Sequence, residues 1–318
     1  MIKFIVRRLT IAALIMLGAS LFSFSLIFFA PGNPAEAIIA AETGEEPSLL
    51  EIKFFLHEYG LNAPFVTQCT QWLYMIAHGD LGTSFRTGEP VLVEFIDRFP
   101  ATLELAIAAM LIAILISIPL GILAAVKQNS ALDHGSRFAA LWGVSMPNFW
   151  LGLLLILFFS VRLDWFPCFG YGSMEYLILP AITLGTGMTG SLMRLMRASM
   201  LEVLRQDYVR TARAKGLKER VVILKHGFKN ALIPVVTVMG MQIGHLLAGA
   251  VIIETIFAWP GVGKFLVDGI YARDYPVIQG FVLIIALFFV LSNLAVDILY
   301  TYLDPRIRYD ADVEKGVK

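Results

Sequence analysis

Charged residues are scarce in this chain of 318 residues: only 16% are Asp, Glu, Lys or Arg, whereas 58% are hydrophobic. An average soluble domain is roughly 45–50% apolar and about 25% charged. The 25 basic and 25 acidic residues cancel, which argues against the broad basic field of a nucleic-acid-binding domain. The high hydrophobicity excludes a disordered chain, which needs the opposite composition. The composition therefore predicts a membrane protein.

Cysteines are few, and a nucleotide-binding motif is missing. Cys69 and Cys168 are too few for a disulfide scaffold or a cysteine-based zinc site. We expect both cysteines to be free; the alternative is a disulfide between them in an oxidising compartment. A P-loop needs Gly, four residues and then Gly-Lys-Ser/Thr. Its nearest imitation, at Gly263-Lys264, lacks both the first Gly and the Ser or Thr, so any nucleotide must be bound by another protein.

Six long stretches lack Asp, Glu, Lys and Arg. A helix needs about 20 apolar residues to cross a bilayer, because every backbone polar group must be satisfied within the segment. The stretches are residues 9–30, 105–126, 138–161, 176–193, 231–253 and 275–296. They predict an all-α, polytopic membrane protein with six transmembrane helices. The first stretch could be a cleaved signal peptide, but it exceeds the 7–15 residues of a signal core, so we expect a retained span.

The distribution of basic residues predicts the orientation, because Lys and Arg concentrate on the cytoplasmic side of membrane proteins. With the N-terminus inside, six spans place 19 Lys and Arg residues in the inner segments and 6 in the outer ones. We therefore expect a multi-pass protein of the cytoplasmic (inner) membrane with both termini in the cytoplasm.

This arrangement divides the chain into four parts. Residues 1–30 hold the N-terminal cytoplasmic end and the first span, and residues 31–99 form an extracytoplasmic helical segment. Residues 100–303 form the core, with five spans and a basic cytoplasmic loop at 194–230. Residues 304–318 form a cytoplasmic tail.

The outer segment 31–99 carries ten acidic and three basic residues. Helix-like patterns lie near 49–59 and 65–77. A polar region of this size is unnecessary as a connector, so we expect it to dock a partner. The alternative is that acidic residues are merely tolerated outside, because the topology rule largely ignores them.

The inner loop reads DYVRTARAKGLKERVVILKHGFKNALIP from Asp207 to Pro234. Two short helical runs flank Gly216, a residue suited to a left-handed turn. The apolar residues of the second run are predicted to lie close to one stripe: Val221, Val222, Leu224, Phe228 and Leu232. Such a pair of helices, tied at both ends to spans, could transmit a mechanical push. The alternative is a basic helix pair that lies on the membrane surface.

At these residues the chain resembles the permeases of ABC importers. The segment Arg210-Thr211-Ala212 with Gly216 is similar to their EAA loop, in which Glu-Ala-Ala is followed by Gly four positions after the second Ala. Ala212 and Gly216 match that pattern, whereas Arg210 and Thr211 depart from it in the way usual for the peptide/nickel class. Further blocks that resemble this class are GDLGTSF (79–85), FPATLELA (99–106), SMPNFWLG (145–152), ETIFAWPGVGKFLVDGI (254–270), RDYPVIQ (273–279) and NLAVDILY…LDPRIR (293–308).

The resemblance implies a transmembrane permease subunit with the type I ABC importer permease fold. Such a subunit pairs with a second homologous permease, two cytoplasmic ATPase subunits that bind ATP and Mg, and an extracytoplasmic solute-binding protein. It has no catalytic residues and no cofactor of its own, and it moves solute by alternating access. The ATPase-coupling role of the EAA loop falls here on Asp207, Tyr208, Arg210, Thr211, Ala212, Ala214, Lys215 and Gly216.

Polar residues on the apolar spans are candidates for the solute path: Ser145, Asn148, Ser191, Gln242, His245 and Asn293. Met241 and His245 share one helix face, and such a pair could meet nickel. Two ligands are too few, so we predict no metal site.

Charged residues at the ends of spans are candidates for a functional role, because placing a charge near hydrocarbon costs free energy. They are Glu104, Glu254 and Asp297. All three can reach an interface, so we expect structural roles, with Arg306 or Arg308 as possible partners of Asp297.

Other classes stay open. An intramembrane enzyme would need a catalytic constellation at span depth, which the sequence lacks. An ATP-independent channel or ion-coupled carrier is permitted by six spans but gives the basic loop no purpose. The substrate stays open among dipeptides, oligopeptides, glutathione and nickel as ion or chelate. The short outer connection 162–175 and the blocks SMPNFWLG and FAWPGVGK resemble nickel and glutathione permeases more than dipeptide permeases.

Overall fold

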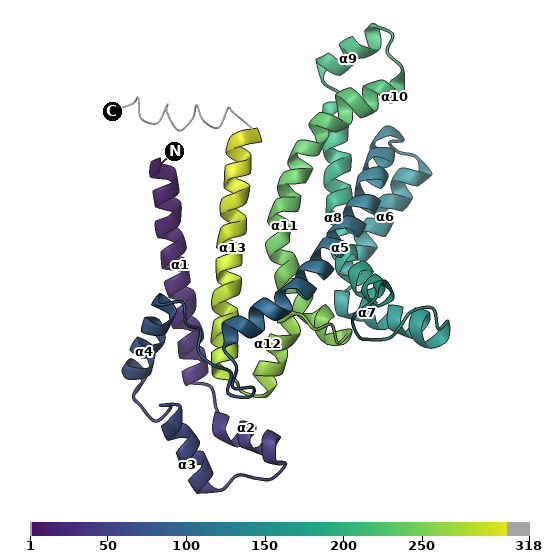
Figure 1. Ribbon diagram of the computed structural model, residues 1–318. Helices are drawn as coiled ribbons and strands as arrows, with labels where there is room; N and C mark the ends of the chain where they lie inside the picture. Colours follow the sequence, from purple (N-terminus) through teal and green to yellow (C-terminus); the bar gives the residue numbers. More distant parts are fainter. Residues whose placement is uncertain (1, 304–318) are drawn as a thin grey trace. The chain divides into compact units, whose positions relative to one another are not determined.

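The computed structural model describes residues 2–303, except for the side chains of 2–9, 41–42, 243, 245, 247–249, 293 and 295–303. The described chain folds into helices without a β-strand (Figure 1), which confirms the predicted all-α class. Five of its helices are long and apolar enough to cross a membrane, and a bent helix pair makes up to six. The predicted tail 304–318, with Arg306 and Arg308, lies outside the described residues.

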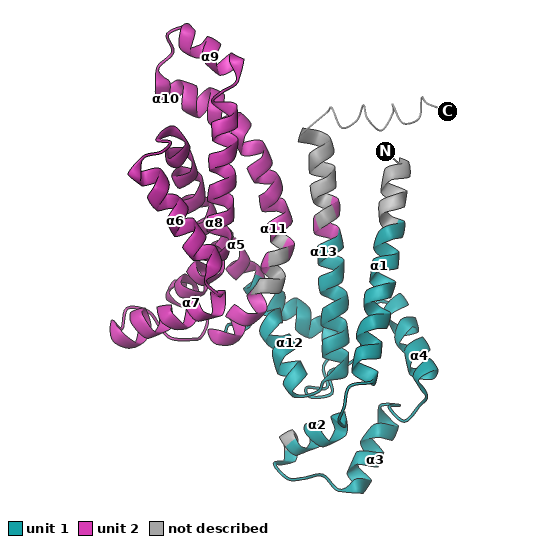
Figure 2. Ribbon diagram, turned by 180° about the vertical axis from the view of Figure 1, so that it is seen from behind, with its two compact units in different colours: residues 1–102, 259–290 teal, residues 103–258, 291–318 magenta. Residues whose placement is uncertain are grey.

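The chain forms two compact units (Figure 2). The first, residues 1–102 and 259–290, contains α1 (Ile2–Phe28), α2 (Pro34–Thr43), α3 (Leu49–Glu58), α4 (Phe65–Ala77) and α12 (Val262–Tyr271). The second, residues 103–258 and 291–318, contains α6 (Ala131–Ser145), α7 (Asn148–Leu155), η1 (Ile156–Arg162), α8 (Met174–Val203), α9 (Asp207–Ala214), α10 (Glu219–Val221), η2 (Val222–Phe228) and α11 (Lys229–Ile256). Helices α5 (Val91–Val126) and α13 (Tyr275–Leu303) contribute residues to both units.

The third predicted span is wrong as a continuous helix. Residues 138–161 divide between α6 and the pair α7–η1, whose axis turns by 101° at a short break. The break falls at Met146, which is extended (φ −77°, ψ 129°), followed by Pro147. Proline has no N–H to donate to the preceding turn and disfavours helical geometry in the residue before it. Pro147 therefore ends one helix and starts another.

The helical patterns of the outer segment are confirmed by α3 and α4. Helix α3 begins with a reciprocal capping box, in which Ser48 and Glu51 each accept a hydrogen bond from the other's backbone N–H. Helix α4 packs against α1, where the Trp72 indole N–H donates to Ser20 Oγ at 3.1 Å. Phe24, Cys69 and Trp72 form the buried cluster at this contact.

Hydrogen bonds join sequence blocks that are far apart in the chain. Ser84 donates to the buried Asp274 carboxylate, with Oγ and Oδ2 2.5 Å apart, and thus ties GDLGTSF to RDYPVIQ. The Trp259 indole donates to the Ala101 carbonyl at 2.8 Å, and the Val262 N–H donates to Thr102 Oγ1 at 2.9 Å. These two bonds tie FPATLELA to the segment that begins α12.

Close helix contacts in the second unit depend on glycine. A Cβ on Gly185 of α8 would lie 2.6 Å from the Ala109 carbonyl oxygen of α5, and one on Gly190 would lie 2.5 Å from the Ala140 carbonyl oxygen of α6. Both distances are too short for any side chain, so the helix backbones touch directly at these points. Small residues allow this close packing between membrane helices.

Candidate functional site

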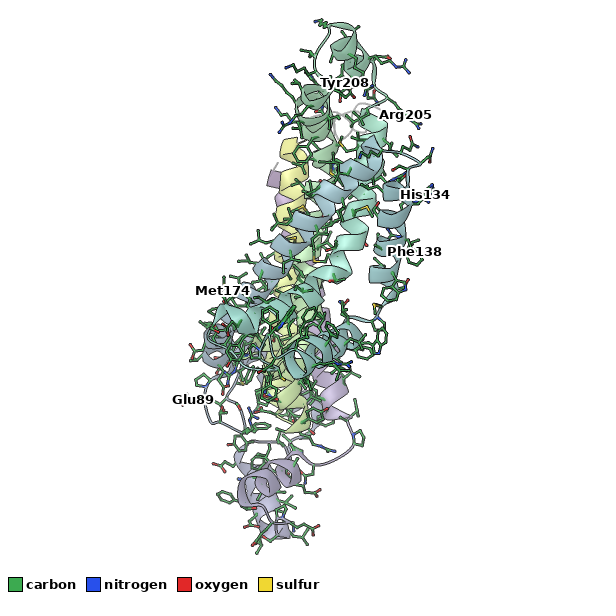
Figure 3. All side chains as sticks on the ribbon, turned by 90° about the vertical axis from the view of Figure 1, so that its right-hand side faces the viewer. Glu89, His134, Phe138, Met174, Arg205 and Tyr208 are labelled. Atoms are coloured by element: carbon green, nitrogen blue, oxygen red, sulfur yellow. The ribbon has the colours of Figure 1, made fainter. Side chains whose placement is uncertain are left out.

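The basic loop is a small folded element at one end of the second unit. Helix α8 leads into α9, and a turn then leads through α10 and η2 into α11. Both ribbon views place α9 beyond the ends of α5 and α6, at the tip of the α8–α11 pair (Figures 1 and 2). Tyr208 and Arg205 lie at this end in the view with side chains (Figure 3).

An apolar cluster holds α9 against the segment that follows. Val209 and Val222 are fully buried, and Ala212 between them is 5% exposed. Val203 and Leu204 at the end of α8 pack against the same cluster. Ala212, which matches the family motif, therefore faces the interior of the loop rather than a partner.

Polar contacts close the loop at two further points. The Asn230 amide donates to the Tyr208 hydroxyl at 2.8 Å, and that hydroxyl donates to the His226 carbonyl at 3.4 Å. Across the turn, the Arg213 guanidinium donates to both carboxylate oxygens of Glu219, at 2.7 and 3.2 Å. Together these contacts make α9 a preformed surface.

Gly216 adopts the left-handed conformation expected from its sequence context, with φ +76°. Nothing lies within 4 Å of a Cβ built at this position. The requirement for glycine here is therefore one of backbone conformation and not of space. A β-branched side chain is strongly disfavoured at such a φ angle, whereas asparagine tolerates it.

The exposed face of α9 and its turn consists largely of basic side chains and of residues with small side chains. The residues that reach solvent here are Asp207, Tyr208, Arg210, Thr211, Arg213, Ala214, Lys215, Gly216 and Leu217. The Arg210 side chain is 72% exposed and approaches only Asp207, at 3.5 Å, among the ion pairs described on this loop. Arg210 is thus available to a partner at the position where the general motif has Glu.

The sequence missed Val209 and Arg213, which hold the loop together. The i, i+3 spacing of Val209 and Ala212 is a signal that could have found the buried face of α9. The predicted stripe is not buried as a whole: of its residues Val222 alone is buried, whereas Val221 and Leu224 are 38% and 48% exposed. Residues 222–228 form a π-helix, whose i→i+5 hydrogen bonds widen each turn and shift the faces that an α-helical spacing predicts.

The candidate solute-path residues lie on several helices. Ser145 and Asn148 flank the break between α6 and α7, where Ser145 is exposed and Asn148 half-buried. The Asn148 amide packs against Gly187 of α8, 2.9 Å from a Cβ built there. Ser191 and Gln242 are half-buried. The side chains of His245 and Asn293 lie outside the described residues.

The charged residues at span ends differ in their surroundings. Glu104 accepts a hydrogen bond from the Tyr171 hydroxyl at 3.1 Å, and Glu254 is fully buried. The Asp297 side chain lies outside the described residues. Cys69 and Cys168 are both free thiols. Among the residues that the structure describes, no group of three potential metal ligands comes together.

Long apolar helices and a basic folded loop at the end of one unit are the features that the described residues offer for comparison with known proteins. Two solved structures share the fold at low sequence identity. An inward-facing MetNI methionine ABC transporter chain matches with a TM-score of 0.56 at 17% identity, over 67% of this chain and 97% of that one. A chain of an amino acid ABC transporter crystallised with histidines matches with a TM-score of 0.51 at 15% identity, over 68% and 94%. The fold is that of an ABC importer permease.

The chain belongs to the family described as binding-protein-dependent transport system inner membrane component, which residues 117–309 match. Residues 1–106 match the N-terminal component of the same systems. The chain is therefore a multi-pass inner membrane permease subunit, a component of a transport system.

Several curated relatives match over nearly the whole chain. The dipeptide transport system permease protein DppB of Alkalihalophilus pseudofirmus is 44% identical over 97% of this chain and 100% of its own length. DppB of Escherichia coli K12 is 43% identical over 97% and 99%. The oligopeptide transport system permease protein AppB of Bacillus subtilis is 42% identical over 97% and 100%. The predicted resemblance to the peptide/nickel class is confirmed.

Proposed function

We propose that this chain forms one half of the translocation path of an ATP-driven importer of small peptides. The support is that full-length relatives at 42–44% identity are named for dipeptide and oligopeptide transport. The expectation of a nickel or glutathione substrate gains no support from these relatives. The chain works with a second homologous permease, two cytoplasmic ATPase subunits and an extracytoplasmic solute-binding protein, and ATP and Mg bind to the ATPases.

The observation that carries the coupling role is the folded loop at the tip of α8 and α11. Its core of Val209, Ala212 and Val222 and the Arg213–Glu219 pair make it stiff enough to pass a displacement to both helices. The exposed face that includes Arg210, Thr211 and Lys215 docks on the ATPase. When ATP closes the ATPases, the loop moves and the spans change from inward-open to outward-open. Such a shift requires that ATP bind one of the two conformations more tightly.

The solute path is proposed to follow the break between α6 and α7. Within a bilayer, non-helical backbone is tolerated only where protein or a water-filled cavity covers it. The break leaves last-turn carbonyls of α6 and first-turn N–H groups of α7 without helical partners, and Ser145 and Asn148 stand beside it. Peptide groups of a substrate carry the complementary donors and acceptors. Ser191, Gln242, His245 and Asn293 are further candidates along this path.

The orientation follows from the basic residues: both termini and the loop 194–230 face the cytoplasm, and the acidic segment 31–99 faces outward, where it receives the binding protein. Glu104, Glu254 and Asp297 keep structural roles in this proposal.

The test is uptake by proteoliposomes that contain the complete transporter, with the binding protein outside and ATP enclosed. We expect labelled di- and tripeptides to accumulate only when ATP is hydrolysed and the binding protein is present. Uptake that ignores ATP would identify a channel or ion-coupled carrier instead. Nickel-63 in parallel vesicles decides between metal and peptide, and mass spectrometry with metal analysis of the purified binding protein identifies the solute that it retains.

A further inference from the structure

The segment from Asn148 to Tyr171 forms an arm of the second unit, made of α7, η1 and the loop that follows. It turns by 101° from the axis of α6 and returns to the start of α8 at Met174. In the view with side chains, Met174 lies far from Tyr208 and Arg205 along the unit (Figure 3). The arm is therefore at the end of the unit opposite to the basic loop.

Helix α5 marks the depth of the arm in the bilayer. After Glu104, 22 residues follow without a charge (105–126), and at 1.5 Å per residue they span about 33 Å. The hydrocarbon core is about 30 Å thick. Glu104 therefore lies at one boundary of the hydrocarbon, whichever side of the membrane that is.

Three contacts hold the arm at this boundary. The Tyr171 hydroxyl donates to Glu104 at 3.1 Å. The Gly170 N–H donates at 3.0 Å to the carbonyl of Phe257, the residue that ends α11. On the outgoing part of the arm, a Cβ on Gly152 would lie 3.3 Å from the Phe257 ring. The start and the end of the arm thus both lie at the level of Phe257, just after α11, and the end also lies at the level of Glu104 within α5. The arm therefore leaves and returns at one boundary of the membrane rather than crossing the bilayer.

The exposed surface of the arm is apolar and aromatic. Its large side chains with at least 45% exposure are Phe149, Trp150, Leu153, Leu157, Phe158, Val161, Trp165, Phe169 and Tyr171. A patch of this kind is too apolar for water. Trp and Tyr are typical of the region where hydrocarbon meets headgroups. The charged residues of the arm, Arg162 and Asp164, fall together at the end of η1, where headgroups or water can solvate them.

We propose that the arm is an interfacial lipid-binding element, embedded at the boundary between acyl chains and headgroups on the Glu104 side of the membrane. Its occupant is bilayer phospholipid, because the exposed apolar side chains belong to a segment that is attached to Glu104 and Phe257, at the depth where the charge-free run of α5 begins. The helical backbone of α7 and η1 satisfies its own polar groups, as contact with lipid requires. The arm thereby anchors one end of the broken span. The proposal depends neither on the substrate nor on ATP coupling.

Spin labels test the depth of the arm directly. Cys69→Ala and Cys168→Ser remove the native thiols, and single cysteines are then placed at Leu157 and Trp165, with Leu115 as a mid-span control and Glu45 as a water-exposed control. The full chain is reconstituted in phosphatidylethanolamine–phosphatidylglycerol vesicles, alone and as the complete transporter. Power saturation with oxygen and a water-soluble nickel chelate then gives the collision rate of each label with an apolar and a polar reagent.

We expect the oxygen-to-nickel collision ratio at positions 157 and 165 to be several-fold above that at 45 and below that at 115. A ratio equal to that at 45 would place the arm in water and overturn the proposal. Low collision rates with both reagents in the complete transporter would show a protein partner, such as the second permease, and would overturn it as well.

A second measurement uses the intact chain. Lipids brominated near the headgroup should quench tryptophan fluorescence, and the double variant Trp150→Phe and Trp165→Phe should lose a large part of that quenching. Equal quenching in the native chain and the variant would contradict the proposal.

Discussion

Asp133 of α6 and Arg197 of α8 form a bidentate ion pair in the interior of the second unit. The guanidinium Nε and one terminal nitrogen each lie 2.7 Å from a carboxylate oxygen. The carboxylate is fully buried, and the guanidinium is 17% exposed. The backbone N–H of Asn129 also donates to this carboxylate. The pair fixes the start of α6 to α8 at a point between the solute-path candidates and the basic loop.

Asp133→Ala should destabilise the protein by about 3 kcal/mol, because it leaves a buried guanidinium without its partner. The double variant Asp133→Leu with Arg197→Met should recover much of this loss, since it removes both charges. Thermal unfolding of the purified chain in detergent measures the effect, with Asp207→Ala on the surface as control. A double variant less stable than either single variant would show that the pair does not act as a unit.

Gly216→Val should abolish ATP-dependent uptake while the protein still inserts in the membrane, because valine cannot adopt φ +76° without strain. Gly216→Asn, at the same position, should keep most of the uptake, since asparagine tolerates the left-handed conformation. Uptake by proteoliposomes and ATPase activity of the purified complex are compared for both. Equal activities of the two variants would contradict a conformational role for this glycine.

Val222→Asp should uncouple ATP hydrolysis from transport, because a carboxylate in the buried cluster with Val209 and Ala212 breaks the fold of the loop. Leu224→Asp, two residues further along, introduces the same charge at a side chain that is 48% exposed. It should leave co-purification with the ATPases nearly unchanged. Equal effects of the two variants would mean that both side chains contribute to one packed stripe, as the sequence pattern predicts, and would contradict the burial of Val222 alone.

Asn148→Leu should lower the rate of peptide uptake, because it removes the amide beside the break between α6 and α7. Phe149→Leu changes the adjacent residue, which is 47% exposed, without removing a polar group, and should have a much smaller effect on the initial rate. The maximal rate and the half-saturating peptide concentration are measured for both variants at equal expression. An unchanged rate in Asn148→Leu would remove this residue from the solute path.

The sequence by itself determined the class of fold and the approximate position of most of the long helices, although not of the broken one at 138–161. Long runs without charge predict membrane spans because lipid offers no partner to a charge or a free backbone group. Helices α3 and α4 of the outer segment and the left-handed turn at Gly216 could also be predicted, because local backbone preferences set them. The order of motif blocks was sufficient to place the chain among importer permeases.

Only the tertiary structure decided which residues meet. The sequence shows Pro147, but whether a proline kinks or breaks a helix depends on its neighbours. The direction of the 101° turn goes together with the packing of α7 against Gly187 and Phe257. The pairs Asp133–Arg197 and Ser84–Asp274 join residues 64 and 190 positions apart, a distance that no local pattern encodes. The face of the loop that is buried follows from the π-helix, whose register is set by packing against Val209. Local spacing specifies each helix, whereas contacts between distant segments decide its breaks, its register and the depth at which it rests.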